Sequence, residues 1–227
     1  MDRRHFVAGA GATIVSGPAQ ASVAVDRFGP SVSGGSVILL YGSDGLTNSG
    51  RYQFAANMIA GAGYSVLLPR YFEATGDQRA RYGEIKSKFP VWLEAIETIT
   101  GDQQARFAVV GFSLGGALAL ALAGRDRRIK AVVDFFGFLP PGLERASLPP
   151  MLILHGDADR VVPVSNAGAI ERLVKSNGAL SKAISIPAKD MVSPWRAGPM
   201  RSRGHKLFCA STSDDRVGGA FVEDRDL

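Results

Sequence analysis

The chain has 227 residues, of which 46% are hydrophobic and 21% are charged, the ordinary balance of a globular protein with one sizeable core. Its net charge of +5 comes from scattered lysines and arginines, without the basic block that nucleic-acid binding needs. No apolar run reaches the roughly 18 residues of a membrane span. The single cysteine, Cys209, excludes an intrachain disulfide and a cysteine-based metal site.

Residues 1–21 have the pattern of an export signal that is removed from the mature protein. Asp2–Val7 resembles the twin-arginine motif of bacterial export signals, and Ala19 and Ala21 supply a small-x-small cleavage pattern after a Gly/Ala-rich stretch. The alternative is a basic N-terminus without a targeting role. We expect export by the twin-arginine machinery, a mature chain that begins near Ser22, and a periplasmic or secreted location.

Beyond residue 34, short apolar runs alternate with helical periods. Strands are predicted at residues 36–41, 64–68, 106–111, 129–136, 151–154 and 181–186. Helices are predicted at residues 53–62, 77–100, 114–123 and 166–176, with Gly83 and Pro90 as candidate interruptions of the second. This alternation predicts an α/β fold, a mostly parallel sheet with helices on both faces, in a domain over residues 22–187. The active sites of such sheets lie outside the carboxyl ends of the strands.

A strand, a tight turn and an Ala/Leu helix meet in the sequence at residues 109–116, Val-Val-Gly-Phe-Ser-Leu-Gly-Gly. The pattern G-x-S-x-G in this context indicates a nucleophile elbow with Ser113 as the nucleophile. Gly111 and Gly115 suit it because a sharp strand-to-helix turn crowds the backbone. The helix N-terminus offers N–H groups to a developing negative charge. The alternative is a glycine-rich turn with a buried serine.

A serine hydroxyl needs a general base, usually histidine, and that base needs an orienting carboxylate. In this architecture the chain order is serine, acid, histidine. The loop after strand 151–154 carries Asp157 and Asp159, and we favour Asp159 as the acid. The alternative for both carboxylates is turn formation. His155 precedes both, and we expect it to be structural.

Two backbone N–H groups are expected to hold the oxyanion of the reaction. One belongs to Leu114, which follows the nucleophile. The other comes from the loop after the first predicted strand, where Ser43 is the best donor by position and Gly42 and Asp44 are near alternatives. The plain alternative for this loop is a simple glycine turn.

Four segments in this order resemble the dienelactone hydrolase family of α/β-hydrolases. They are Tyr41–Leu46, Gly61–Pro69, Gly111–Gly116 and His155–Pro163. The resemblance spans about residues 30–187 and implies an ester- or lactone-cleaving fold, with Ser113 and Asp159 at the nucleophile and acid positions.

The chain departs from this family at two positions of the site. True dienelactone hydrolases carry cysteine where this chain has Ser113, and a glutamate in the first loop where this chain has Gly42 or Ser43. The dienelactone substrate is therefore not carried over, and the resemblance favours a serine esterase.

The histidine that the family places a few residues after the last strand, in a segment like Pro-Gly-x-x-His-Gly, is missing from its place. Here residues 188–192 contain no histidine, and the only one downstream is His205. Residues 188–227 also lack a helical period, although the fold normally closes with a helix. We predict an aberrant or disordered tail without the closing helix. His205 can act as the base only if the tail loops back over the site.

A reading-frame shift near Pro187 accounts for this tail. Read from the third base of each codon, the junction of Asp190 and Met191 encodes only His or Tyr, and the junction of Met191 and Val192 encodes only Gly. The junction of Pro187 and Ala188 allows Gly, and the junction of Ala188 and Lys189 allows Lys, Gln or Glu. The junction of Lys189 and Asp190 again allows Gly. The hidden segment then becomes Pro-Gly-x-Gly-His-Gly, the family's pattern. Gene codons that exclude CAT across Asp190 and Met191 would contradict this hypothesis.

The sequence thus predicts an exported serine hydrolase for small esters or lactones, with Ser113, Asp159 and His205 as candidate catalytic residues. It implies no metal, no organic cofactor and no nucleic-acid partner. Residues 71–76 and 138–149 are expected to shape the pocket. The alternative is a catalytically impaired or non-catalytic α/β-hydrolase-fold protein that binds a ligand or partner without turnover.

Overall fold

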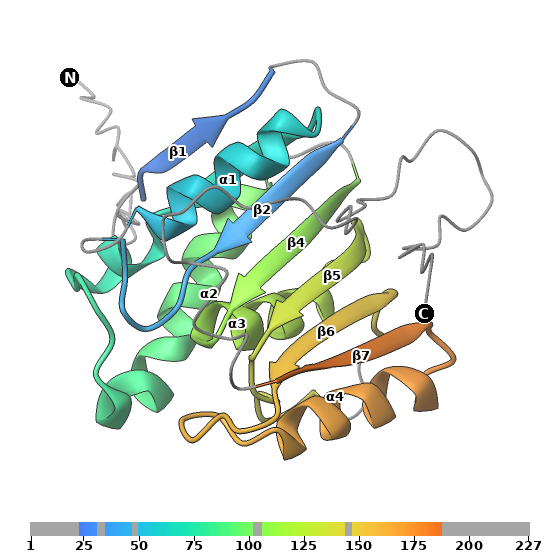
Figure 1. Ribbon diagram of the computed structural model, residues 1–227. Coiled ribbons are helices and arrows are strands. Elements are labelled where there is room, and N and C mark those ends of the chain that lie inside the picture. Colours follow the sequence, from blue (N-terminus) through green and yellow to red (C-terminus); the bar gives the residue numbers. More distant parts are fainter. Residues whose placement is uncertain (1–22, 31–34, 47–49, 102–105, 144–146, 188–227) are drawn as a thin grey trace, which may run out of the picture.

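A computed structural model describes residues 23–30, 35–46, 50–101, 106–143 and 147–187. Seven strands of this part form one sheet, in the order β1-β3-β2-β4-β5-β6-β7 (Figure 1). The strands are β1 (Val25–Phe28), β2 (Ser36–Leu40), β3 (Ser65–Pro69), β4 (Phe107–Phe112), β5 (Ile129–Phe135), β6 (Met151–Gly156) and β7 (Ser181–Ile186). The helices are α1 (Arg51–Gly61), α2 (Ile85–Gly101), α3 (Leu114–Ala123) and α4 (Ser165–Ser176), with 3₁₀ turns η1 (Tyr71–Thr75) and η2 (Tyr82–Glu84).

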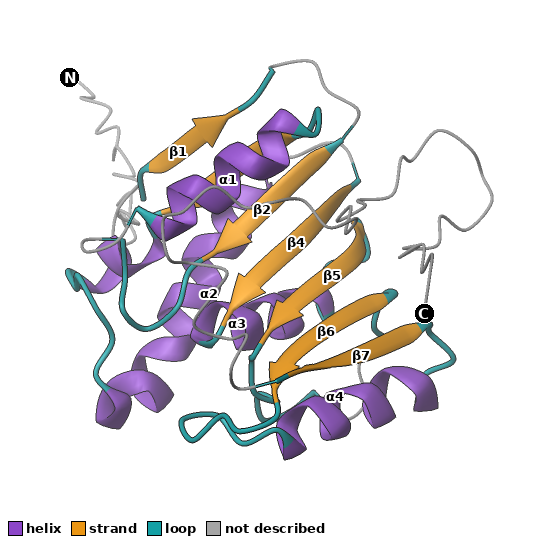
Figure 2. Ribbon diagram, in the orientation of Figure 1, coloured by secondary structure: helices purple, strands orange, loops and turns teal. Residues whose placement is uncertain are grey.

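The predicted fold class is confirmed, because every neighbouring pair of strands is parallel except β1 and β3. Parallel strands joined by right-handed crossovers place their helices on a face that depends on the direction of travel across the sheet. The step from β2 to β3 runs opposite to the steps from β3 to β4, β4 to β5 and β6 to β7. Helix α1 therefore lies on one face and α2, α3 and α4 on the other (Figure 2).

The edge strand β1 was not predicted from the sequence. Its four residues carry no apolar run, and they form a strand because they pair antiparallel with β3, Val25 opposite Pro69. A charged contact strengthens this edge, since the Arg70 guanidinium donates to the Asp26 carboxylate at 2.9 Å. The other strands begin and end within two residues of their predicted bounds.

The prediction of one helix over residues 77–100 was wrong in its first part. Helix α2 begins at Ile85, after the 3₁₀ turn η2. The preceding residues are drawn into other contacts, since the Ala80 N–H donates to the Ser43 carbonyl at 2.8 Å. Pro90 lies inside α2 and does not end it. The buried side chains of Trp92, Leu93 and Ile96 attach the helix to the core instead.

The core is densest between the sheet and α3. Nine of the ten residues of α3 are buried, and Ala121 is the exception. The strand residues that share this face, among them Val109, Val132 and Ile153, are at most 1% exposed. The sheet therefore presents a well-covered platform behind the helix that follows Ser113.

The opposite face of β5, β6 and β7 is less well covered. The register places Val133 beside Leu152, Phe135 beside Leu154, and Leu154 beside Ile184, and all five side chains are only half-buried. Among the described helices, α1 alone lies on this face, and it packs on β3 and β1.

Within the described ranges, none of the helices has the length and apolar character that a membrane span needs.

Candidate active site

The backbone at Ser113 has the strained geometry that an elbow requires. Ser113 lies between β4 and α3 with φ 53° and ψ −115°, in a region that L-residues with a side chain rarely adopt. Such a conformation costs about 1–3 kcal/mol and persists only where surrounding contacts fix it. Here the Ser113 N–H donates to the Phe135 carbonyl at 2.8 Å, and its own carbonyl accepts the N–H of Gly116 at 2.9 Å.

Two glycines make room for this turn, as the sequence predicted. A Cβ atom at Gly111 would lie 2.3 Å from the carbonyl oxygen of Gly115. A Cβ atom at Gly115 would lie 2.3 Å from the carbonyl oxygen of Leu40, at the end of β2. Both approaches are far below a van der Waals contact. Helix α3 can start this close to the sheet only because these residues have no side chain.

The loop after β2 is fixed by tyrosine side chains. The Gly42 N–H donates to the Tyr52 hydroxyl at 2.9 Å, and that hydroxyl donates to the Asp44 carboxylate. The Tyr71 hydroxyl donates to the Tyr41 carbonyl. Since its N–H is already engaged, Gly42 is a poor candidate for an oxyanion donor. Ser43 is the residue of this loop that lines the cavity beside Ser113.

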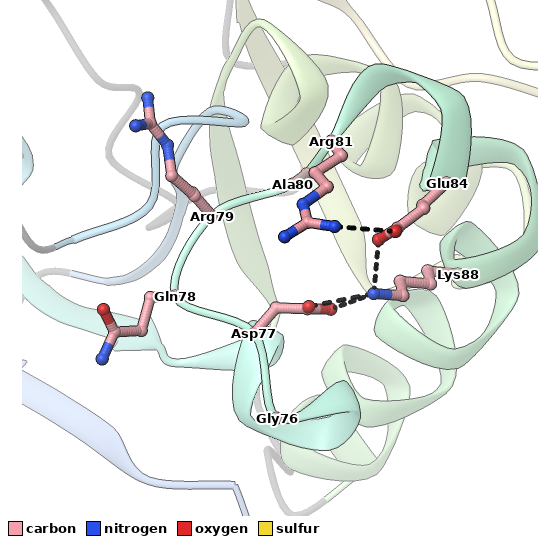
Figure 3. A pocket seen from close by; sticks show the side chains of 8 residues that line it. All are labelled: Gly76, Asp77, Gln78, Arg79, Ala80, Arg81, Glu84 and Lys88. Atoms are coloured by element: carbon pink, nitrogen blue, oxygen red, sulfur yellow. Dashed lines mark hydrogen bonds and ion pairs between the residues drawn. The ribbon is translucent and has the colours of Figure 1, made fainter.

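Residues 76–84 precede α2 and are tied to it by a network of ion pairs (Figure 3). Lys88 Nζ lies 2.9 Å from the Asp77 carboxylate and 2.7 Å from the Glu84 carboxylate, and Arg81 approaches Glu84 at 3.7 Å. Hydrogen bonds from Lys88 and Thr75 hold the pKa of the Asp77 carboxyl below its ordinary value. These residues line a polar hollow in which Arg81 and Lys88 are paired with acidic side chains, while Arg79 lies apart from the network (Figure 3).

Asp159 is held by the backbone of its own loop. Its Oδ1 accepts the N–H groups of Val161 at 2.8 Å and Val162 at 2.9 Å, and its carboxylate is largely buried. The residues that follow it, Val161 to Pro163, line the same cavity as Ser113. Asp157 is exposed, and its N–H donates to the Ile186 carbonyl at 3.1 Å. The loop that carries Asp157 and Asp159, called here the acid loop, therefore lies beside the end of β7.

His155 lies at the end of β6 and is 1% exposed. Its Nε2 lies 2.8 Å from the carbonyl oxygen of Val162, which can only accept, so Nε2 carries the proton. The same nitrogen is 3.9 Å from the Asp159 carboxylate. His155 thus braces the acid loop, and it is not among the residues that line the cavity beside Ser113.

His155 is the one histidine within the described ranges, because His5 and His205 lie outside them. The structure therefore brings Ser113, Leu114, Ser43 and the Asp159 loop to one cavity, and the candidate base His205 is not placed by it. Residues 188–227, the predicted aberrant tail, also lie outside the described part.

The cavity that contains Ser113, called here the Ser113 cavity, has a volume of about 690 Å³. This volume is typical of small-molecule sites. Residues 138–143 form part of its wall, in accordance with the sequence prediction. Residues 71–76 do not line it, contrary to expectation. Tyr71 and Phe72 point instead into the core, where they pack against Trp92.

Asp134 is a buried carboxyl beside the elbow that the sequence analysis did not single out. It is fully buried in β5, and its Oδ1 accepts the Gly137 N–H at 3.1 Å. Gly116, in the first turn of α3, is so close that a Cβ atom there would lie 2.1 Å from Asp134 Oδ1. Burial raises the pKa of Asp134 to about 7. An aspartate next to the apolar run Ala131–Val133 was the signal that could have found it.

No metal centre is formed by the part of the chain that the structure describes. No group of three or more His, Cys, Asp or Glu side chains there is arranged to hold an ion.

Comparison with known proteins identifies relatives for most of the described part. The model of the dienelactone hydrolase family matches residues 36–187. A carboxymethylenebutenolidase homolog from Xenopus tropicalis is 21% identical over 149 residues, which cover 59% of this chain and 60% of the relative. A probable feruloyl esterase C from Aspergillus terreus is 34% identical over 111 residues, which cover 46% of this chain and 40% of the relative.

These shares mean that the chain spans only about half of the length of these two relatives. Among solved structures, esterase PE8 superposes with a TM-score of 0.55 and 24% sequence identity, over 74% of this chain and 90% of the esterase. At this identity the likeness supports the fold alone.

Proposed function

The chain belongs to the dienelactone hydrolase family, and we propose that it is a serine hydrolase that cleaves small carboxylic esters or lactones. One observation carries the proposal: Ser113 has the strained elbow conformation at a cavity that the Asp159 loop also lines. The similarity to a probable feruloyl esterase agrees with an ester substrate.

Each residue of the site has a distinct part in this proposal. The Ser113 hydroxyl attacks the ester carbonyl, and the N–H groups of Leu114 and Ser43 stabilise the negative charge on the carbonyl oxygen. Two backbone N–H groups orient the Asp159 carboxylate, so that its second oxygen can accept a hydrogen bond from an imidazole. That imidazole takes the Ser113 proton and later gives it to the leaving alkoxide.

The base is the part of the site that depends on the tail. Because Asp157 is hydrogen-bonded to the end of β7, a histidine a few residues beyond Ile186 would lie close to the acid loop. This supports the proposal that a frame shift near Pro187 removed the base. Losing one member of such a triad typically lowers the rate by several orders of magnitude. Sequencing the gene around Pro187 tests the shift directly.

A fluorophosphonate probe, which reacts with activated serines, tests the proposed nucleophile. We expect labelling of the folded, frame-restored chain that disappears in Ser113→Ala. Labelling that persists unchanged in Ser113→Ala would place the reactive serine elsewhere and contradict the assignment.

The second candidate function is ligand or partner binding without turnover. It is favoured by one observation, that no histidine in the described ranges lines the Ser113 cavity. Folded protein that binds an ester but never reacts with the fluorophosphonate, even with the frame restored, would favour this candidate.

We also propose export of the protein through the twin-arginine machinery, based on the sequence of residues 1–21. Fractionation of cells that express the full chain tests this proposal. Replacement of Arg3 and Arg4 by lysine should retain the protein in the cytoplasm. An unchanged distribution would contradict the export proposal.

A further inference from the structure

The Ser113 cavity extends well beyond the nucleophile. Besides Ser113 and Leu114 at the start of α3, it is lined by Ala121, Gly124 and Arg125 at the far end of the helix. At a rise of about 1.5 Å per residue, Ala121 lies about 12 Å along the helix axis from Ser113. Ala121 is also the only residue of α3 that is not buried. The cavity therefore has lining residues near both ends of the helix.

The walls on either side of this extension are apolar. Helix α2 contributes Ile85, Phe89 and Leu93, and the segment after β5 contributes Phe138 and Leu143. These side chains come from two elements that are far apart in the sequence. Together they form a channel of hydrocarbon surface that begins at the reacting serine.

The charged groups at the Ser113 cavity are two exposed cations. Lys86 projects from α2, and Arg125 follows α3. Arg125 is already paired, with its Nη1 3.0 Å from the Glu97 carboxylate. No acidic side chain of the described ranges lines the cavity. A polar or charged ligand would therefore find few partners along the inner wall.

We propose that this extension binds an extended apolar chain attached to the ester carbonyl, so that the preferred substrates are medium-chain esters rather than small polar lactones. The inference rests on the proposed function, since it specifies the substrate of the same site. A short ester would occupy only the Ser113 end and leave the apolar walls in contact with water. Each methylene that enters the channel should improve binding about fourfold, from roughly 0.8 kcal/mol per buried CH₂.

Binding to Ser113→Ala tests this inference without turnover. Isothermal titration with ethyl butanoate, ethyl hexanoate and ethyl octanoate should give Kd values that fall by about fourfold per added methylene. Equal Kd values for the three esters would overturn the inference.

A blocked channel supplies the complementary variant. In the Ser113→Ala background, Ala121→Phe should abolish the advantage of ethyl octanoate over ethyl butanoate. Ala62→Phe makes the same change at an exposed position after α1, on the other face of the sheet, and should keep the advantage. If Ala121→Phe does not fold, Phe89→Ala removes part of the wall and should reduce the advantage. An unchanged advantage in a folded Ala121→Phe or Phe89→Ala variant would overturn the inference.

Monoethyl suberate tests the polarity of the channel, because it matches ethyl octanoate in length and ends in a carboxylate. We expect it to bind at least tenfold more weakly than ethyl octanoate, and tighter binding would overturn the inference in favour of recognition by Lys86 or Arg125. Failure of the two proposals can be told apart. Graded binding without any ester turnover by the frame-restored chain would refute the hydrolase proposal alone, whereas turnover by that chain with no dependence on chain length would refute this inference alone.

Discussion

Individual residues at the elbow are determined by close packing rather than by hydrogen bonding alone. Ser113 has a positive φ, and a side chain at any of the glycines around it would collide with atoms of a neighbouring element. Gly115 approaches the end of β2, and Gly116 approaches Asp134 in β5. The position of the proposed nucleophile therefore depends on residues that have no chemistry of their own.

Gly115→Ala should destabilise the protein, because the new Cβ atom would meet the Leu40 carbonyl oxygen at 2.3 Å. We expect a loss of about 1–3 kcal/mol in the free energy of unfolding, as for other overpacked sites. Gly61→Ala is the matched control, since nothing lies within 4 Å of the added atom. It should be neutral or stabilising by up to about 1 kcal/mol. Urea denaturation measures both, and equal effects would contradict the packing account.

Asp134 should make stability depend on pH. Its pKa is about 7 in the folded state, above its ordinary value, so the folded state holds this proton more tightly than the unfolded state. Stability should therefore fall as the pH rises from about 4 to about 7 and change little from this group above that range. The loss should be on the order of a few kcal/mol.

Asp134→Asn should remove this dependence, because the amide cannot ionise and its oxygen can still accept the Gly137 N–H. The variant should be more stable than the parent at about pH 8, with a smaller difference at about pH 5. Thermal unfolding at both pH values measures the effect. Parallel pH profiles for the two proteins would contradict the assignment.

At the scale of elements, the loop after β2 depends on a side chain from α1. The Tyr52 hydroxyl accepts the Gly42 N–H and donates to Asp44, on either side of Ser43. The Ser43 carbonyl is also fixed, by Ala80. Tyr52 therefore acts as a positioning residue for the proposed oxyanion donor, and it does not itself line the Ser113 cavity.

Tyr52→Phe should lower kcat of the frame-restored enzyme about tenfold and leave KM almost unchanged. The reason is that a displaced Ser43 N–H would lose its hydrogen bond to the oxyanion in the transition state, which is worth about 1.4 kcal/mol. Tyr64→Phe removes a hydroxyl near the opposite end of the sheet and should leave kcat as it is. Steady-state kinetics on a p-nitrophenyl ester measures both variants. A change confined to KM would assign Tyr52 to substrate binding instead.

The elements that could be predicted from the sequence are those with strong local patterns. The apolar run and turn around Ser113 sufficed for β4 and α3, which lie within one residue of their predicted bounds. β1 could not be predicted, because its stability comes from pairing with β3. The start of α2 could not be predicted either, since Ala80 is held by a contact with Ser43, far away in the sequence.

The site could be predicted only where a motif carries the chemistry. Ser113 and the Asp159 loop lie at one cavity because parallel strands end at the same edge. The roles of Tyr52 and Asp134 depend on contacts between elements, and no local pattern encodes them. The catalytic base stays a prediction.

At the scale of the whole molecule, the sheet is covered unevenly. Val133, Phe135, Leu152 and Leu154 are half-buried on the face that a closing helix is expected to cover. Half-exposed apolar side chains contribute less stability than fully buried ones, because each Å² of apolar surface that is buried contributes about 25 cal/mol. This agrees with the proposal that the frame shift removed a helix as well as the base.

Restoring the reading frame should therefore raise the melting temperature by several degrees, as expected when apolar surface is buried. It should also reduce the binding of an apolar dye such as ANS. Circular dichroism and dye fluorescence measure the two effects on the chain as given and on the frame-restored chain. A frame-restored chain that is no more stable would contradict the account of the uncovered face.

The roles of Ser113 and of the tail are tested most directly by comparing ester hydrolysis by the 227-residue chain and by the frame-restored chain, each with and without Ser113→Ala. We expect the frame-restored chain to hydrolyse p-nitrophenyl butanoate at least a thousandfold faster than the 227-residue chain. We also expect Ser113→Ala to abolish this turnover. Equal rates for the two chains would contradict the account of the tail, and turnover that survives Ser113→Ala would contradict the nucleophile itself.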